Sequence, residues 1–171
     1  MTTASPQISI RRATTADVRR IHAMREELSD TNVLLTLEMV DLFERVPEFM
    51  VAVESAGRVV GAGALHVMWQ DLAEIRSMIV DPATRGQGIG HALVDALLAE
   101  AKALGVERVF CLTFETDFFA KHGFEPISDV PVDEATFEAM ARSHDDGVAE
   151  FLDLARVKAN TLGNTRMLKR L

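Results

Sequence analysis

The chain has 171 residues, of which 48% are hydrophobic and 26% charged, a composition typical of a soluble globular protein with a sizeable core. Its net charge of −8 at pH 7 argues against a nucleic-acid-binding protein, because such a protein needs a basic face. No hydrophobic run approaches the roughly 20 residues of a membrane span, and the N-terminal residues lack the apolar segment of a secretory signal.

The first half of the chain predicts one strand, two helices and then three further strands. Alternating or β-branched residues favour strands, and apolar residues at every third or fourth position favour helices. Strands are expected over residues 8–12, 49–54, 59–68 and 73–80, and helices over residues 17–28 and 37–46. The last three strands follow one another closely, so we expect an antiparallel meander.

The second half predicts a long helix over residues 88–104, ended by Gly105 as its C-cap. Strands are expected over residues 109–113 and 123–127, helices over residues 116–122, 133–141 and 147–154, and an edge strand over residues 166–171. Asp145 and Asp146 are expected to cap the last helix. We find no repeat and no linker. The sequence therefore predicts a single α/β (α+β) domain over residues 1–171, with a mixed central sheet and helices on both faces.

A glycine-rich turn, DPATRGQGIGH over residues 81–91, connects a predicted strand with the long helix. Glycines let the backbone turn its N–H groups inward, and the start of a helix adds unpaired donors and a positive dipole end. These features predict a pyrophosphate cradle. The turn lacks the Gly-Lys-Ser/Thr of a Walker loop and the GxGxxG spacing of dinucleotide-binding folds. A plain loop that uses glycine only for turning is the alternative.

The pattern Arg85-x-x-Gly88-x-Gly90, after a strand ending in IVDP, resembles the acyl-CoA signature of the GNAT superfamily of N-acetyltransferases. The order of the predicted elements is similar to that fold over nearly the whole chain. The segment FFAKHGF over residues 118–124 resembles the family's helix and strand beside the pantetheine arm. The resemblance implies acetyl-CoA as cosubstrate, bound by Met78, Ile79, Val80, Arg85, Gly86, Gln87, Gly88, Ile89, Gly90, His91, Phe118 and Phe119.

Four segments resemble the acetyltransferase domain of N-acetylglutamate synthases, most of all the short, stand-alone type. They are residues 61–67, 73–82 and 108–124, and the ending GNTRMLKRL. This implies transfer of acetyl to the α-amine of L-glutamate, the first step of arginine biosynthesis, by direct attack in a ternary complex. The long type adds a domain that carries arginine feedback. We expect no space for that domain in 171 residues, so any feedback would need another route. Relatives are often dimers, so a homodimer is an open alternative to a monomer.

The resemblance implies three catalytic groups. Glu74 is expected to take a proton from the α-amine, directly or through water. The backbone N–H of Met78 is expected to stabilise the oxyanion where the strand splays. The Thr113 hydroxyl matches the position that protonates the departing thiolate. The alternatives are a solvated Glu74 or one paired with Arg76, and an ordinary β-branched strand residue at position 113.

The carboxylates of the acceptor need cations or N–H donors. The residues expected to contact the acceptor are Leu65, His66, Ser77, Lys158, Thr165 and Arg166. Leu65 and Ser77 match positions that offer main-chain groups, and Thr165 matches a hydroxyl position.

The sequence departs from the family pattern where His66 replaces a common lysine, and where Leu37 and Gly163 lie at or near arginine positions. Lys158 or Arg166 is expected to supply the missing charge. Arg76 and Arg45 are weaker choices, and each of these residues could be an ordinary surface cation. A site with fewer fixed cations would also take glutamine or another small amine. A CoA-sensing module without an acceptor is the non-catalytic alternative.

No metal is expected, because the histidines, carboxylates and single cysteine lack the spacing of metal ligands. Neither nucleic acid nor a membrane is an expected partner, which leaves a small amino acid. Cys111 lies in an apolar stretch, where we expect a core residue. Because one cysteine cannot form an internal disulfide, the expected compartment is the cytoplasm.

Overall fold

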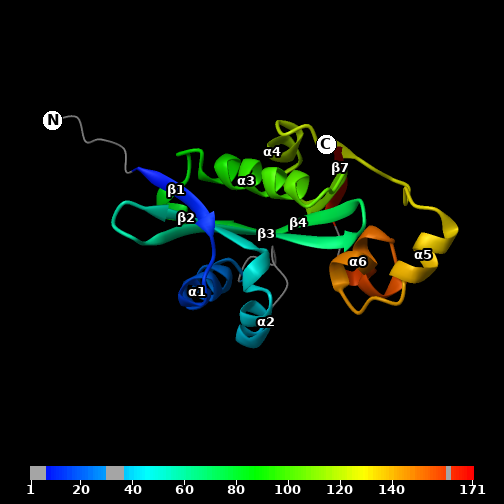
Figure 1. Cartoon of the computed structure of the whole chain (residues 1–171), viewed down its shortest axis with the longest axis horizontal. Helices are drawn as coiled ribbons and strands as arrows, with labels where there is room; N and C mark the ends of the chain where they lie inside the picture. Colours follow the sequence, from blue (N-terminus) through cyan, green and yellow to red (C-terminus); the bar gives the residue numbers. More distant parts are fainter. Residues whose placement is uncertain (1–6, 30–36, 161–162) are drawn as a thin grey trace. The chain divides into compact units, whose positions relative to one another are not determined.

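The computed structural model describes residues 7–29, 37–160 and 163–171, which form a seven-stranded sheet and its helices (Figure 1). The strands are β1 (Ile8–Arg12), β2 (Phe49–Glu54), β3 (Val59–Trp69), β4 (Leu72–Val80), β5 (Arg108–Thr113), β6 (Glu125–Pro126) and β7 (Thr165–Arg170). The α-helices are α1 (Val18–Ser29), α2 (Met39–Glu44), α3 (Ile89–Ala103), α4 (Thr116–Ala120), α5 (Glu134–Met140) and α6 (Asp146–Phe151). Within the described ranges, no helix is long and apolar enough to cross a membrane.

The sheet is mixed, as predicted, with the strand order β1-β2-β3-β4-β5-β7-β6. β2 pairs antiparallel with β1 and β3, β4 pairs parallel with β5, and β7 pairs antiparallel with β5 and β6. The predicted strand over residues 166–171 is present as β7, but its predicted place at the edge of the sheet is wrong. The two-residue β6 adds outside β7, and its Pro126 suits an edge because proline cannot donate to a further strand.

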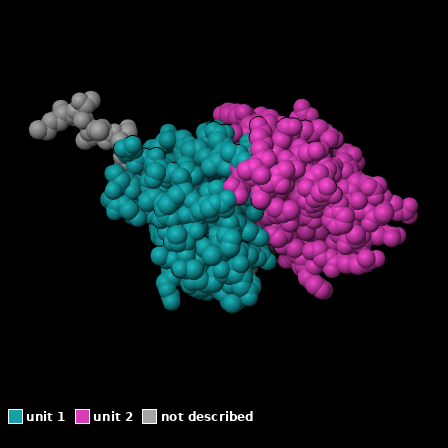
Figure 2. Space-filling view, in the orientation of Figure 1, with its two compact units in different colours: residues 1–65, 77–99 teal, residues 66–76, 100–171 magenta. Residues whose placement is uncertain are grey.

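The chain divides into two compact units, which Figure 2 colours separately. Unit 1 comprises Met1–Leu65 and Ser77–Ala99, and unit 2 comprises His66–Arg76 and Glu100–Leu171. β3 and β4 contribute residues to both units. The single domain over residues 1–171 remains a prediction.

Unit 1 packs helices on both faces of its strands. Alternation along β2 sends Val51 and Val53 to a core shared with α1 and α2, and Ala52 to a core shared with α3. Gly61 on β3 makes the close approach of α3 feasible, because a Cβ there would lie 3.0 Å from Ile89 and 3.1 Å from Leu93. Helix α3 is therefore seated with its first turn against β3.

Unit 2 has its own core, in which Phe110 of β5 meets Phe151 of α6 edge to face at 5.3 Å between ring centroids. Cys111 is buried, as predicted. Asp145 caps α6 by accepting a hydrogen bond from the N–H of Val148 at 3.0 Å, which confirms the predicted cap. Gly105, with φ of 81°, ends α3 as predicted.

The predicted helix over residues 37–46 is shorter in the structure, where α2 ends at Glu44 and a 3-10 turn follows over Val46–Glu48. Pro47 accounts for this change, because it lacks the N–H that a continuing helix needs. The predicted helices over residues 116–122 and 147–154 likewise end early, at Ala120 and Phe151.

Candidate active site

The glycine-rich turn of unit 1 joins β4 to α3. After Asp81 a 3-10 turn covers Pro82–Thr84, and α3 begins at Ile89. Gly86 and Gly88 have φ of 81° and 77°, a region that residues with a Cβ rarely adopt. Residues 85–88 are exposed, and α3 has 15 residues, long enough for a developed dipole. The turn thus has the backbone and exposure that an anion cradle requires.

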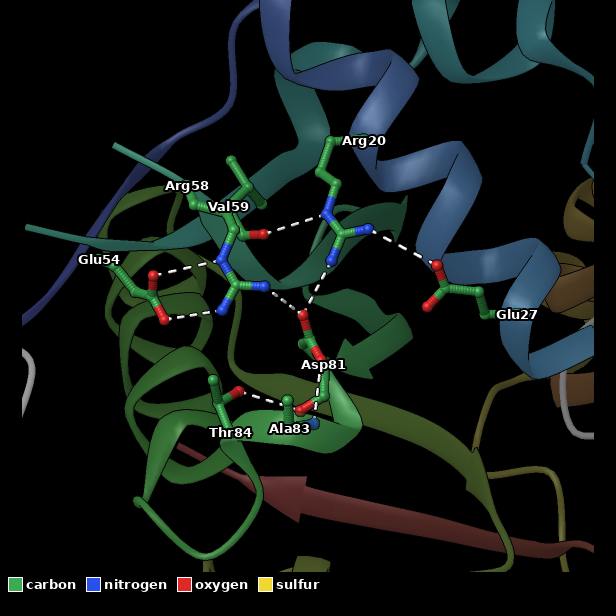
Figure 3. Close-up of polar contacts among 8 residues, drawn as sticks. All are labelled: Arg20, Glu27, Glu54, Arg58, Val59, Asp81, Ala83 and Thr84. Carbon is green, nitrogen blue, oxygen red and sulfur yellow. Dashed lines mark hydrogen bonds and ion pairs between the residues drawn. The ribbon is translucent and has the colours of Figure 1, made fainter. Parts of the chain in front are cut away.

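The start of this turn is anchored through Asp81, which is 8% exposed (Figure 3). Its Oδ2 accepts hydrogen bonds from Nη2 of Arg20 and Nη1 of Arg58, each at 2.9 Å. Its Oδ1 accepts from the N–H of Ala83 at 2.9 Å. The N–H of Ala83, together with the two guanidinium groups, holds the pKa of Asp81 below its usual value.

The two arginines connect Asp81 to other elements of unit 1. Arg58, in the turn between β2 and β3, donates to both carboxylate oxygens of Glu54, at 2.9 and 3.2 Å. Arg20 of α1 donates to the carbonyl of Val59 at 3.3 Å and lies 3.7 Å from Glu27 (Figure 3). Polar contacts from α1 and the β2–β3 turn therefore fix the residue from which the cradle begins.

The other cofactor residues predicted in unit 1 differ in burial. Ile79 and Ile89 are buried in the core, which leaves their backbone for a cofactor. Met78 and Val80 are half-buried and pack against the core shared with α3. Arg85, Gly86, Gln87 and Gly88 are exposed, and Gly90 and His91 are half-buried in the first turn of α3.

In unit 2 the predicted pantetheine residues form an aromatic cluster. Phe119 is buried and meets Phe124 edge to face at 5.3 Å. Phe118 is half-buried and lies 5.1 Å from Phe119 and 5.5 Å from His122, measured between ring centroids. Phe119 is thus a core residue, and Phe118 is the more accessible of the pair.

β4 departs from regular strand geometry at Ser77, whose φ is 57°. Within unit 2, β4 pairs parallel with β5 from Leu72 to Glu74. The splay near Met78 remains a prediction. Non-glycine residues in the left-handed region carry strain, and such strain is concentrated at functional sites.

Glu74 is buried in unit 2, with 4% of its surface exposed. Its Oε2 accepts no hydrogen bond from the described residues and lies 3.5 Å from Nη1 of Arg76. Burial raises the pKa of Glu74 to about 7, Arg76 and His66 oppose this rise, and the Asp145 and Glu150 carboxylates increase it. A solvated Glu74 is therefore excluded, and the side chain is a buried carboxyl that titrates near neutral pH.

A polar network surrounds Glu74. Nη1 of Arg76 donates to both carboxylate oxygens of Asp145, at 3.0 and 2.9 Å, and Nε2 of His66 lies 3.6 Å from Oδ2 of Asp145. Glu150 of α6 is also buried, and burial, with the carboxylates of Asp146 and Asp145, raises its pKa to about 7.

The start of α6 packs against the carboxyl of Glu74. A Cβ at Gly147 would overlap Oε2 of Glu74 and lie 3.0 Å from its Cδ. Nothing in the sequence pointed to Asp145, Gly147 or Glu150 as neighbours of Glu74, because residues of a cap and a short helix resemble a solvated surface segment. Arg20 and Arg58 were missed because arginines of a helix and a turn resemble ordinary surface cations.

The remaining predicted groups lie on β3, β5 and β7. Thr113, at the end of β5, is 8% exposed, and its hydroxyl accepts the N–H of Glu115 at 2.8 Å, which leaves its own proton for donation. Thr165 is paired with Thr113 across β5 and β7. Leu65 is buried, so only its main chain is suited to polar contact.

The predicted substrate cations are differently placed. The guanidinium of Arg166 donates to the carbonyls of Asp129, at 3.1 Å, and Phe151, and burial lowers its pKa. A substrate carboxylate at Arg166 would have to share these donors. Lys158 falls in the short helix Ala155–Asn160, but its side chain lies outside the described residues.

Comparison with known proteins identifies the family. The profile of the "Acetyltransferase (GNAT) family" matches residues 17–124. The amino-acid acetyltransferase of Mycobacterium tuberculosis is 55% identical over 164 residues, which are 93% of this chain and 92% of the relative.

Solved structures of similar fold support this family assignment. The crystal structure of Rv2747 from Mycobacterium tuberculosis, in complex with CoA and NLQ, has a TM-score of 0.89 and 54% identity, covering 95% of this chain and 99% of that chain. The N-acetylglutamate synthase of Neisseria gonorrhoeae, complexed with coenzyme A and N-acetyl-glutamate, shares the fold with a TM-score of 0.77 at 24% identity, over 98% of this chain and 36% of that chain. The chain therefore belongs to the GNAT family of acetyltransferases.

Proposed function

We propose that this enzyme transfers the acetyl group of acetyl-CoA to the α-amine of L-glutamate. The observation that carries the proposal is Glu74, a buried carboxyl with a pKa of about 7 on β4, the strand that leads into the glycine-rich turn. The relative at 55% identity is an amino-acid acetyltransferase, and Rv2747 was crystallised with CoA. The product, N-acetyl-L-glutamate, would feed arginine biosynthesis.

In this proposal the turn binds the pyrophosphate of acetyl-CoA. The positive φ of Gly86 and Gly88 and the first N–H groups of α3 suit a doubly charged anion. The exposed Arg85 adds a cation at the same turn. Acetyl-CoA supplies the activated acetyl group, and the turn of this chain holds the cofactor in position.

Glu74 is the proposed general base. The α-amine of an amino acid is mostly protonated at neutral pH and attacks the thioester only after losing a proton. A base works best when its pKa is near the working pH, which holds for a carboxyl raised to about 7. The backbone N–H of Met78, next to the strained Ser77, is the proposed donor to the oxyanion.

The hydroxyl of Thr113 is the proposed acid for the departing CoA thiolate. Because it accepts the N–H of Glu115, its own proton is directed elsewhere. The main chain of Leu65 and Ser77, the Thr165 hydroxyl, and the cations His66, Lys158 and Arg166 are the proposed contacts of the acceptor.

L-Glutamine is a second candidate acceptor, favoured by one observation. His66 and Arg76 face Asp145, and Arg166 donates to two carbonyls, so these cations are already engaged. Glutamine has one carboxylate fewer to neutralise than glutamate, and its side-chain amide needs no cation.

A thiol-release assay with acetyl-CoA and a panel of amino acids tests the proposal. Turnover with glutamate above the other amino acids supports it. Preference for glutamine would mean that glutamine, not glutamate, is the acceptor, with acetyl transfer from acetyl-CoA unchanged. Acetyl-CoA binding without turnover of any amino acid would contradict the proposed acceptor.

A further inference from the structure

Asp145 and Glu74 compete for one cation. Nη1 of Arg76 lies 3.0 and 2.9 Å from the two oxygens of Asp145, but 3.5 Å from Oε2 of Glu74. His66, the other basic residue of the network, also faces Asp145, at 3.6 Å. Charge attraction falls with distance, and hydrogen bonding adds to the closer pair, so Arg76 is committed mainly to Asp145.

We propose that Asp145 is a positioning residue for acetyl transfer: by holding Arg76, it keeps this cation from pairing closely with Glu74 and so preserves Glu74 as a proton acceptor. The inference rests on the proposed function in that it takes Glu74 as the base. Asp145 lies beyond residues 17–124, which the GNAT profile matches, and it acts through Arg76.

The charges around Glu74 agree with this role. A cation close to a buried carboxylate stabilises its charged form and makes it a weaker base. Glu150 faces Glu74 from α6 and acts in the opposite direction, as does the Asp145 carboxylate itself. Cys111 of β5 is neutral, because burial raises the pKa of its thiol. Among the described groups that shift the pKa of Glu74, Arg76 most strongly stabilises the charged form. The position of Arg76 therefore affects how readily Glu74 accepts a proton.

Asp145 also fixes the backbone that covers Glu74. Its Oδ1 caps α6 through the N–H of Val148, and Gly147, two residues further, contacts the Glu74 carboxyl. The two roles can be separated by mutation. Asparagine caps a helix about as well as aspartate but has no charge.

The test is the pH dependence of kcat/KM in Asp145→Asn. Arg76 can then pair more closely with Glu74, so the acid limb of the pH profile, expected near pH 7 in the wild type, should move to lower pH and the plateau rate should fall. Asp133→Asn is the matched control, because it removes the same charge from the exposed cap of another unit 2 helix, α5, and should leave the limb in place. In Asp145→Asn/Arg76→Met, the limb should return toward higher pH.

An unchanged limb in a folded Asp145→Asn variant overturns the inference, and so does an equal shift in Asp133→Asn. Infrared titration of the Glu74 carboxyl, assigned by its loss in Glu74→Gln, gives a readout that needs no turnover. If Glu74→Gln retains full activity, the proposed base fails, whereas the infrared band still reports whether Asp145 controls Arg76. If Asp145→Asn does not fold, Arg76→Gln provides the second arm: the Glu74 band should titrate at higher pH, and no change overturns the inference.

Discussion

Gly147 lies directly against the carboxyl of Glu74, and a Cβ at this position would overlap Oε2. The contact joins the first turn of α6 to the strand that bears the proposed base. A side chain at position 147 would have to displace this carboxyl, so the glycine allows the carboxyl its present position.

Gly147→Ala should displace the Glu74 carboxyl and lower kcat at neutral pH, with a loss of about 1–3 kcal/mol in stability from overpacking. Gly57→Ala is the control. Gly57 has φ of 85° and open space around it, so the substitution should cost stability and leave kcat unchanged. Equal kcat in the two variants would mean that Glu74 is not the base or that it tolerates displacement.

Gly88→Ala should raise the KM for acetyl-CoA about 5-fold or more, because alanine at φ of 77° costs roughly 1–2 kcal/mol and shifts the turn. Gly105 has φ of 81° and equally open space, so Gly105→Ala has the same backbone cost at the other end of α3. Steady-state kinetics should show a change in KM for the first variant alone. Unchanged affinity in Gly88→Ala would contradict the cradle.

Asp81→Asn should raise the KM for acetyl-CoA with little change in kcat, because the turn loses its anchor to Arg20 and Arg58. Asp17→Asn is the control, since Asp17 is also buried and also pairs with an arginine, Arg11, at 2.7 and 2.9 Å. Both should lose about 1–3 kcal/mol of stability at pH 7. A rise in KM of the same size in Asp17→Asn would show that general destabilisation, not the anchor, is responsible.

The loss of stability in Asp17→Asn and Asp81→Asn should depend on pH. The Arg11 guanidinium lowers the pKa of Asp17 to about 2, and the pKa of Asp81 is also lowered, chiefly by the N–H of Ala83. A carboxyl whose pKa is lowered on folding stabilises the folded protein at pH values above its pKa in the unfolded state. This stabilisation is lost as the pH falls through its pKa in the folded state. The deficit of Asp17→Asn, measured by chemical unfolding, should therefore shrink between about pH 4 and pH 2.

Glu74→Gln should be more stable than the wild type at pH 8 by roughly 1–3 kcal/mol. The pKa of Glu74 rises from 4.5 to about 7 on folding because of burial, so its stabilising contribution is present below 4.5 and is lost as the pH rises through 7. Glutamine does not ionise, so the two proteins should converge near pH 4.5. A difference in melting temperature that is constant from pH 4.5 to pH 8 would contradict the raised pKa.

The fold was predictable where local patterns decide it. The alternation in residues 49–54 matches β2, and Gly105 ends α3 because its φ is positive. The place of β7 was not predictable, because the order of strands depends on long-range pairing that no local pattern encodes. At the site, Glu74 and the glycine turn followed from motif resemblance. The contact between Asp145 and Arg76 did not follow from a motif, since it depends on how α6 packs within unit 2.

The central claim is that Glu74 accepts the proton of the α-amine, and the pH dependence of kcat/KM in the wild type and Glu74→Gln tests it most directly. The wild type should show an acid limb near pH 7. Glu74→Gln should be slower by about 100-fold or more at pH 7, and the deficit should narrow at high pH, where the amine is already free. A deficit of constant size across this range, or full activity of the variant at pH 7, would contradict the account.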